Sequence, residues 1–108
     1  AERRGGQPLA LPAEDLATLA ELHQRVLRRF DLAMTVLTNR DTALARAVQQ
    51  DGEDLKSWCI QRQRAHYQRL AGGDLTVQEG STRFLELFNA LRRISGLLNA
   101  ISHTILLA

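Results

Sequence analysis

The fold is decided by the stretch Phe84-Leu-Glu-Leu-Phe-Asn-Ala-Leu-Arg-Arg-Ile-Ser-Gly-Leu-Leu-Asn-Ala-Ile-Ser-His-Thr-Ile-Leu-Leu-Ala108. Apolar residues recur in it at alternating steps of three and four, which is the period of an α-helix and not of a strand. The residues on this line are Phe84, Leu87, Leu91, Ile94, Leu98, Ile101, Ile105 and Ala108. Phe88, Leu97 and Ala90 make the stripe broader than a two-stranded seam needs. We therefore expect one long helix that packs against at least two others.

A first helix is predicted over about residues 13 to 38. Pro12 suits its first position, and Glu14 and Asp15 in the first turn suit the positive end of the helix dipole. Its expected inward line is Leu16, Leu19, His23, Val26, Phe30, Ala33 and Leu37. Residues 1 to 12 have no helical period and contain both prolines, so we expect them to form a flexible linker ahead of a single domain at 13 to 108.

A second helix follows the short connection Thr38-Asn-Arg-Asp41, in which Asn39 can adopt a left-handed cap and Asp41 can cap the next helix. Its expected inward line is the least apolar of the three: Leu44, Val48, Asp51, Leu55, Trp58 or Cys59, Arg62, His66 and Leu70. Two interpretations of Asp51, Arg62 and His66 are open. They form a buried polar network, or this side of the second helix meets solvent or another subunit. Gly52 lowers helix propensity by about 1 kcal/mol relative to Ala, so the sequence allows either a continuous helix or a kink or break near residue 52.

Gly72-Gly73 is expected to end the second helix, and Thr76-x-x-Glu79 has the pattern of a capping box for the third. Gly80-Ser81 could instead delay the regular helix to residue 81 or 82. With short connections, the three helices predict an all-α fold: an antiparallel up-down-up three-helix bundle.

Composition limits the function classes. The net charge is only +2, from thirteen arginines and Lys56 against twelve acids, and nucleic-acid binding needs clustered positive charge. The single cysteine, Cys59, follows Trp58 on an apolar side, so we expect inert packing and not an activated nucleophile. No apolar run is long enough to cross a bilayer and there is no signal start, so we expect a soluble domain. Because the residues give no support to nucleophilic catalysis, we also expect that it is not an enzyme.

Nearly the whole chain, roughly Leu16 to Leu106, resembles a known family, and the last helix and its preceding turn are the most specific part. The run Phe84 to Gly96, preceded by His66-Tyr-Gln-Arg-Leu-Ala-Gly-Gly-Asp-Leu-Thr and followed by Ile105-Leu, is similar to the final helix and preceding turn of a PhoU-like domain. The version it resembles lies at the C-terminal end of bacterial sodium/phosphate cotransporter-related proteins.

The resemblance implies a regulatory domain on the cytoplasmic side of the bacterial inner membrane, controlling phosphate transport through helix-face contacts. The implied partner is the transmembrane part of the same polypeptide or another phosphate-regulation protein.

PhoU-like proteins also carry carboxylates at i and i+4 that can hold iron or zinc. Here Glu86 matches the first acid, but Ala90 stands where the second belongs. The acids of the second helix, Asp41, Asp51, Glu53 and Asp54, include no i, i+4 pair. We therefore predict no metal, cofactor or catalytic residue. The alternative is a metal-carboxylate bundle whose ligands converge from different helices.

The remaining polar residues have two interpretations each. Arg83, Arg92 and Arg93, with Arg25, Arg28 and Arg29, could contact an oxyanion, although Arg-rich helix faces are mostly solvated. No two of the histidines have metal-ligand spacing within a helix. We expect His23 at the edge of the core, hydrogen-bonded to a neighbouring helix. We expect His103 to be exposed.

Self-association is the last expectation. Leu22, Leu85 and Leu106 lie beside the main apolar lines, where a three-helix core leaves them partly uncovered. Full-length PhoU proteins contain two three-helix units packed together, and a second copy could replace the missing unit. We predict a homodimer; the alternative is a monomer in which the stems of Arg and Gln cover these leucines.

Overall fold

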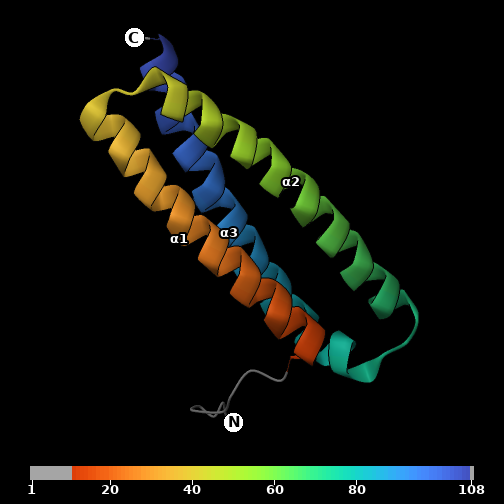
Figure 1. The fold of residues 1–108 in the computed structure, drawn as a ribbon. Coiled ribbons are helices and arrows are strands. Elements are labelled where there is room, and N and C mark those ends of the chain that lie inside the picture. Colours follow the sequence, from red (N-terminus) through yellow and green to blue (C-terminus); the bar gives the residue numbers. More distant parts are fainter. Residues whose placement is uncertain (1–10, 108) are drawn as a thin grey trace, which may run out of the picture.

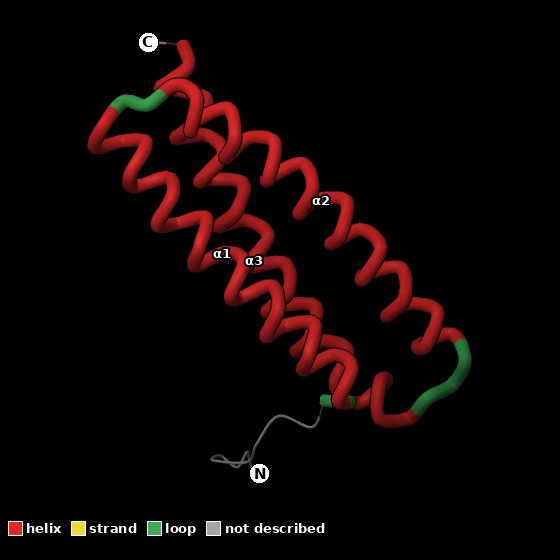
Figure 2. The backbone as a smooth tube through the Cα atoms, viewed as in Figure 1, coloured by secondary structure: helices red, strands yellow, loops and turns green. Residues whose placement is uncertain are grey.

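The computed structural model describes residues 11–107, which form a three-helix bundle (Figure 1). The helices are α1 (Ala13–Asn39), α2 (Thr42–Ala71) and α3 (Leu75–Leu107), and no strand occurs in this range. The chain runs up, down and up, as the tube in Figure 2 also shows. The extents of the rod are 49 × 29 × 17 Å. The start of α1 therefore meets the end of α2, where Arg69 Nη1 lies 2.9 Å from Glu14 Oε2. The predicted all-α three-helix bundle is confirmed.

The first connection differs from its prediction by one residue. Asn39 is the last residue of α1, and Arg40 adopts the left-handed conformation at φ 53°, with its N–H donating to Val36 O over 2.7 Å. Asp41 caps α2 as predicted, because its Oδ1 accepts a hydrogen bond of 3.0 Å from Leu44 N. Pro12 precedes the first helical residue and does not occupy that position itself.

The second connection ends α2 at its glycines, as predicted, with Gly73 at φ 83°. The expected capping box at Thr76 and Glu79 is wrong, because the cap is Asp74. Its Oδ1 accepts from Thr76 N at 3.0 Å and from Val77 N at 3.3 Å. This carboxylate starts α3 at Leu75, so the helix is not delayed to Ser81.

Helix α2 passes through Gly52 without a break. Gly52 is buried, and a Cβ atom there would lie 2.7 Å from Asn99 Cγ and closer still to the Asn99 amide atoms. The glycine is therefore required by the approach of α3 and not by a bend in α2.

The inward face of α1 is rotated by about one residue from its prediction. Its buried residues are Asp15, Thr18, Leu22, Val26, Arg29, Ala33 and Val36. Leu16, Phe30 and Leu37 are 46%, 47% and 50% exposed, and His23 is also exposed, so its expected place at the core edge is wrong. The predicted and the buried lines run side by side on α1 and share Val26 and Ala33; among the residues that they do not share, the apolar Leu16, Phe30 and Leu37 face outward.

The core consists of two apolar clusters separated by polar side chains. The larger cluster joins Leu22 and Val26 of α1, Leu55 and Cys59 of α2, and Phe84 and Phe88 of α3, with Leu11 from the preceding segment. The smaller joins Val36, Ala45, Val48 and Ile105. Residues 1–10 of the predicted linker lie outside the described range.

Candidate functional site

The middle polar layer, defined as Arg29, Asp51, Ser95, Asn99 and the carbonyl of Val48, lies between the two apolar clusters. Arg29 is fully buried. Its Nε donates to Ser95 Oγ at 3.0 Å, Nη1 donates to Val48 O at 2.8 Å and to Asp51 Oδ2 at 3.2 Å, and Nη2 donates to Ser95 O at 3.3 Å and to Asn99 Oδ1. These bonds account for every donor of the guanidinium. Arg29 is therefore a structural tie between the three helices, and the expectation that it could contact an oxyanion is wrong.

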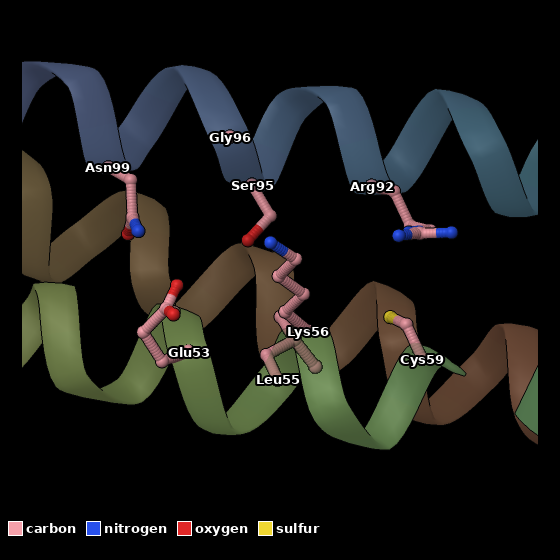
Figure 3. Close-up of a pocket in the computed structure, with 9 residues that line it drawn as sticks. Glu53, Leu55, Lys56, Cys59, Arg92, Ser95, Gly96 and Asn99 are labelled. Carbon is pink, nitrogen blue, oxygen red and sulfur yellow. The ribbon is translucent and has the colours of Figure 1, made fainter. Parts of the chain in front are cut away.

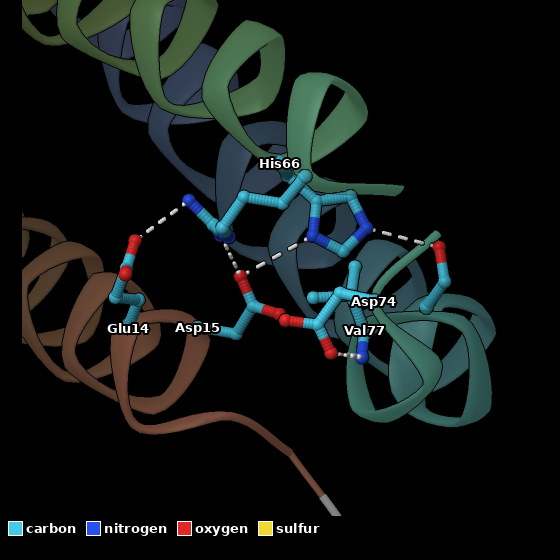
Figure 4. A network of polar contacts seen from close by, with 7 residues as sticks. Glu14, Asp15, His66, Asp74 and Val77 are labelled. Carbon is cyan, nitrogen blue, oxygen red and sulfur yellow. Dashed lines mark hydrogen bonds and ion pairs between the residues drawn. The ribbon is translucent and has the colours of Figure 1, made fainter. Parts of the chain in front are cut away.

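The end polar layer, defined as Asp15, His66, Ser81, Arg69 and Glu14, lies where the start of α1 meets the end of α2 and the first turns of α3 (Figure 4). His66 Nδ1 lies 3.2 Å from Asp15 Oδ1, and His66 Nε2 lies 2.9 Å from Ser81 Oγ. Arg69 bonds Asp15 as well as Glu14. Of the expected inward polar residues on α2, His66 is buried in this layer and Asp51 reaches the middle layer, whereas Arg62 stays at the surface, over the Trp58 ring.

The order Asp15, His66, Ser81 is that of an acid, a base and a hydroxyl in a nucleophilic triad. The surroundings do not suit catalysis, because a nucleophile needs a space in which a reacting group can sit. His66 is fully buried and stacks on Phe84 with ring centroids 4.3 Å apart, and neither His66 nor Ser81 lines any of the four main hollows among residues 11–107. We interpret this group as a polar tie between α1, α2 and α3.

The α2–α3 hollow is a recess of about 350 Å³ between those helices (Figure 3). Its apolar floor is formed by Leu55 and Cys59, and its polar walls carry ionisable and hydrogen-bonding side chains: Glu53, Lys56, Arg92, Ser95 and Asn99. Gly52 and Gly96 complete the lining. Burial raises the pKa of the Cys59 thiol, against the opposing influence of Arg92 and Arg25. Cys59 is thus buried in packing, as the sequence predicted.

The α1–α3 apolar face is defined by seven large side chains: Leu16, Leu27, Phe30 and Leu37 from α1, and Leu87, Ile94 and Leu97 from α3. Each is at least 42% exposed, and Leu97 reaches 67%. Arg25 marks the flank of α1 that faces α2, because its guanidinium lies over the Trp58 ring of α2. The exposed apolar residues of α1 lie on the other flank of this helix, beside α3. On α3 the flank toward α2 is marked by Arg92, which bonds Gln63. Both rows therefore lie on the side of the bundle away from α2, with Leu27 farther out on α1, where it lines a hollow with Gln24, Arg28 and Asp31.

This face replaces the surface that the sequence predicted. Leu22 is fully buried in the larger cluster, and Leu85 and Leu106 are partly buried against the larger and smaller clusters. Leu22 is covered because it lies on the true inward line of α1. The α1–α3 apolar face consists mostly of residues that the period had placed toward the core, together with Leu27, which it had not.

The candidate metal ligands do not converge. Asp41, Glu53, Asp54 and Glu86 are exposed at separate places, and no three His, Cys, Asp or Glu side chains among residues 11–107 gather where a metal ion could be held. His103 is exposed, as predicted, with Nδ1 3.4 Å from Gln49 Nε2. The positions of these acids give no support to the metal-carboxylate alternative.

Within the described helices, none combines the length and the apolar character that a bilayer span needs. Comparison with known proteins found no family model, curated protein or solved structure that this chain matches. The resemblance to PhoU-like domains stays a prediction from the sequence.

Proposed function

We propose that this chain is a helical interaction module that acts through the α1–α3 apolar face. The observation that carries the proposal is the exposure of seven large apolar side chains on two neighbouring helices. Isolated apolar side chains are normal on a protein surface, but a contiguous patch on a soluble domain marks a partner surface. Helix α2, by contrast, exposes Ile60 and Tyr67 as its large apolar side chains, so one side of the bundle is distinctly more apolar.

The spacing of this face favours a helical partner. On α1 the outer row is Leu16, Ala20, His23, Leu27, Phe30, Met34 and Leu37, with alternating steps of four and three. On α3 the row Leu87, Ala90, Ile94, Leu97 and Ile101 has the same alternation. Such rows let side chains of one helix fit between those of another along their whole length. His23 is the one ionisable residue in either row.

The size of the face favours a second copy of the chain as the occupant. The α1 row covers about 21 residues, or ~32 Å of helix, and two helices packed 8–10 Å apart present a strip about 20 Å wide. The resulting area of roughly 600 Å² approaches the ~800 Å² that each partner buries in a standard interface. A two-fold axis across this face would pair the rows of one copy with those of the other, giving the predicted homodimer.

Sedimentation at micromolar concentration tests the dimer. We expect a dimeric mass for the wild type and a monomeric mass for Phe30→Glu and Leu97→Glu, because a buried carboxylate in the interface is strongly unfavourable. Both residues are exposed in the monomer, so the circular dichroism spectrum should not change. Ile60→Glu on α2 is the matched control and should stay dimeric. A monomeric wild type would overturn this assignment of the face.

We further propose that the module regulates a sodium-dependent phosphate transporter-like membrane protein, with contacts to the transmembrane part or to another phosphate-regulation protein. The support is the resemblance to PhoU-like domains over roughly Leu16 to Leu106, which is most specific in the last helix and its preceding turn. Uptake of radiolabelled phosphate by cells that make the natural protein tests this role. Leu97→Glu should change the dependence of uptake on external phosphate, whereas Ile60→Glu should not. Identical uptake in both variants and the wild type would reject the role, even if the chain dimerises.

A further inference from the structure

We propose that the α2–α3 hollow binds a small molecule carrying a carboxylate or phosphate group, with Lys56 and Arg92 holding the anion. The hollow is separate from the α1–α3 apolar face, because Arg92 marks the opposite flank of α3. The proposal therefore does not depend on self-association or on a role in phosphate transport.

The two cations reach the hollow from opposite walls. Lys56 extends from α2 and Arg92 from α3, and both charged groups are directed into the space between the helices (Figure 3). Arg92 is partly buried; its Nη1 donates to Gln63 Oε1 at 3.2 Å and its guanidinium lies 6.0 Å from the Phe88 ring centre. Among residues 11–107, neither cation has a carboxylate within ion-pair distance. A bound oxyanion would provide the missing counter-charge.

The other wall residues restrict the ligand further. Ser95 Oγ accepts from Arg29 Nε, so its own proton is available to the hollow. Asn99 uses its oxygen for Arg29, which leaves its amide N–H groups as donors. Glu53 is a hydrogen-bond acceptor in the same recess. Its carboxylate repels a second anionic group on the ligand and favours a hydroxyl or ammonium group at that end. The best match is a small anion with a neutral or cationic polar end, and about 350 Å³ lies within the range of small-molecule sites.

Gly96 lies at the α3 edge of the hollow and is exposed. A Cβ atom at Gly96 would meet nothing within 4 Å, whereas at Gly52 it would overlap Asn99. A larger side chain at position 96 therefore has room beside the hollow without displacing a core residue. This gives a way to block the site that leaves both cations in place.

An amide NMR titration tests the proposal, with inorganic phosphate and acetate as probes at constant ionic strength and sodium chloride as the reference. We expect saturable shifts in the amides of residues 52 to 59 and 92 to 99 for at least one probe. Tighter binding of phosphate would assign a phosphate-bearing ligand, and tighter binding of acetate a carboxylate. Shifts that do not saturate, or that match those produced by chloride, would overturn the proposal.

The variants separate a built site from general attraction to positive charge. Lys56→Gln and Arg92→Gln should each weaken binding about tenfold, which corresponds to the loss of one charge-assisted hydrogen bond. Arg64→Gln, on the exposed surface of α2, is the matched control and should bind like the wild type. Gly96→Leu should abolish binding with a folded spectrum, whereas Gly96→Ala should retain it. Wild-type affinity in Gly96→Leu, or equal losses in Arg64→Gln and Arg92→Gln, would contradict the site.

Discussion

The middle and end polar layers bury the same kinds of groups, yet they differ in how completely their hydrogen bonds are formed. In the middle layer every donor of Arg29 has an acceptor, and the layer is enclosed by apolar clusters on both sides. In the end layer Asp15 Oδ2 and Arg69 Nε have no partner among the described residues, and Glu14 is 72% exposed in its side chain. A buried polar layer fixes helix register when it is complete, whereas an incomplete one retains part of its desolvation penalty.

The largest expected effect is in the middle layer. Arg29→Ala should lower the free energy of unfolding by about 3 to 5 kcal/mol, because it removes all five bonds and leaves Ser95 and Asn99 buried without this partner. Chemical denaturation followed by circular dichroism measures the loss. Arg28→Ala, one residue away and exposed, is the control and should change stability by less than ~0.5 kcal/mol. Equal stabilities for the two variants would mean that the middle layer does not hold the helices together.

A smaller effect is expected in the end layer. His66→Ala should cost about 2 to 3 kcal/mol, because it removes a buried ring stacked on Phe84 and the bond to Ser81. Asp15 keeps its contact with Arg69, so this layer is not left with an isolated charge. The same denaturation experiment applies, with exposed His103→Ala as the control. A loss larger than that of Arg29→Ala would reverse the ranking of the two layers.

The smallest effect tests the packing against the middle layer. Gly52→Ala gains about 1 kcal/mol of helix propensity, but it displaces Asn99 from Arg29 and overpacks the helix contact, for a net loss of about 1 to 2 kcal/mol. In an Asn99→Ala background the added methyl group has room, and the substitution should become neutral or stabilising. A double-mutant cycle measures this coupling, and additive losses would show that Asn99 is not the obstacle.

The sequence predicted the number of helices and most of their ends, because apolar period, Asp41 and the paired glycines are local signals. It failed for the inward face of α1, and in part for that of α3, where Leu87 and Ile94 are exposed and Ser95 and Ser102 are buried. On α1 the true line contains Asp15 and Arg29, whose burial depends on His66, Ser95 and Asn99 far along the chain. A period search on one chain favours the more apolar row, Leu16, Phe30 and Leu37, and cannot see those partners.

The same limit applies to the candidate sites. Lys56 and Arg92 are separated by half of α2, the second connection and part of α3, so only the packing of these helices brings them to one hollow. The apolar face was misplaced for the same reason as the α1 line, because the helical period places the more apolar row in the core and cannot detect the distant polar partners. Cys59 was placed correctly because it lies among apolar residues on its own helix, and no distant partner is needed to bury it.

Cys59 also makes the bundle suitable for following its own local opening. It is the chain's single thiol, it is 2% exposed at the contact of α2 with α3, and burial raises its pKa, so little thiolate exists in the folded state at neutral pH. Although Cys59 lines the α2–α3 hollow, its 2% exposure leaves little of the thiol within reach of a reagent, so labelling should speed up when α2 separates from α3. When reclosing is fast, the labelling rate is the intrinsic rate multiplied by the fraction of open molecules. The natural chain can thus report the opening of one helix contact, in real time and without an introduced probe.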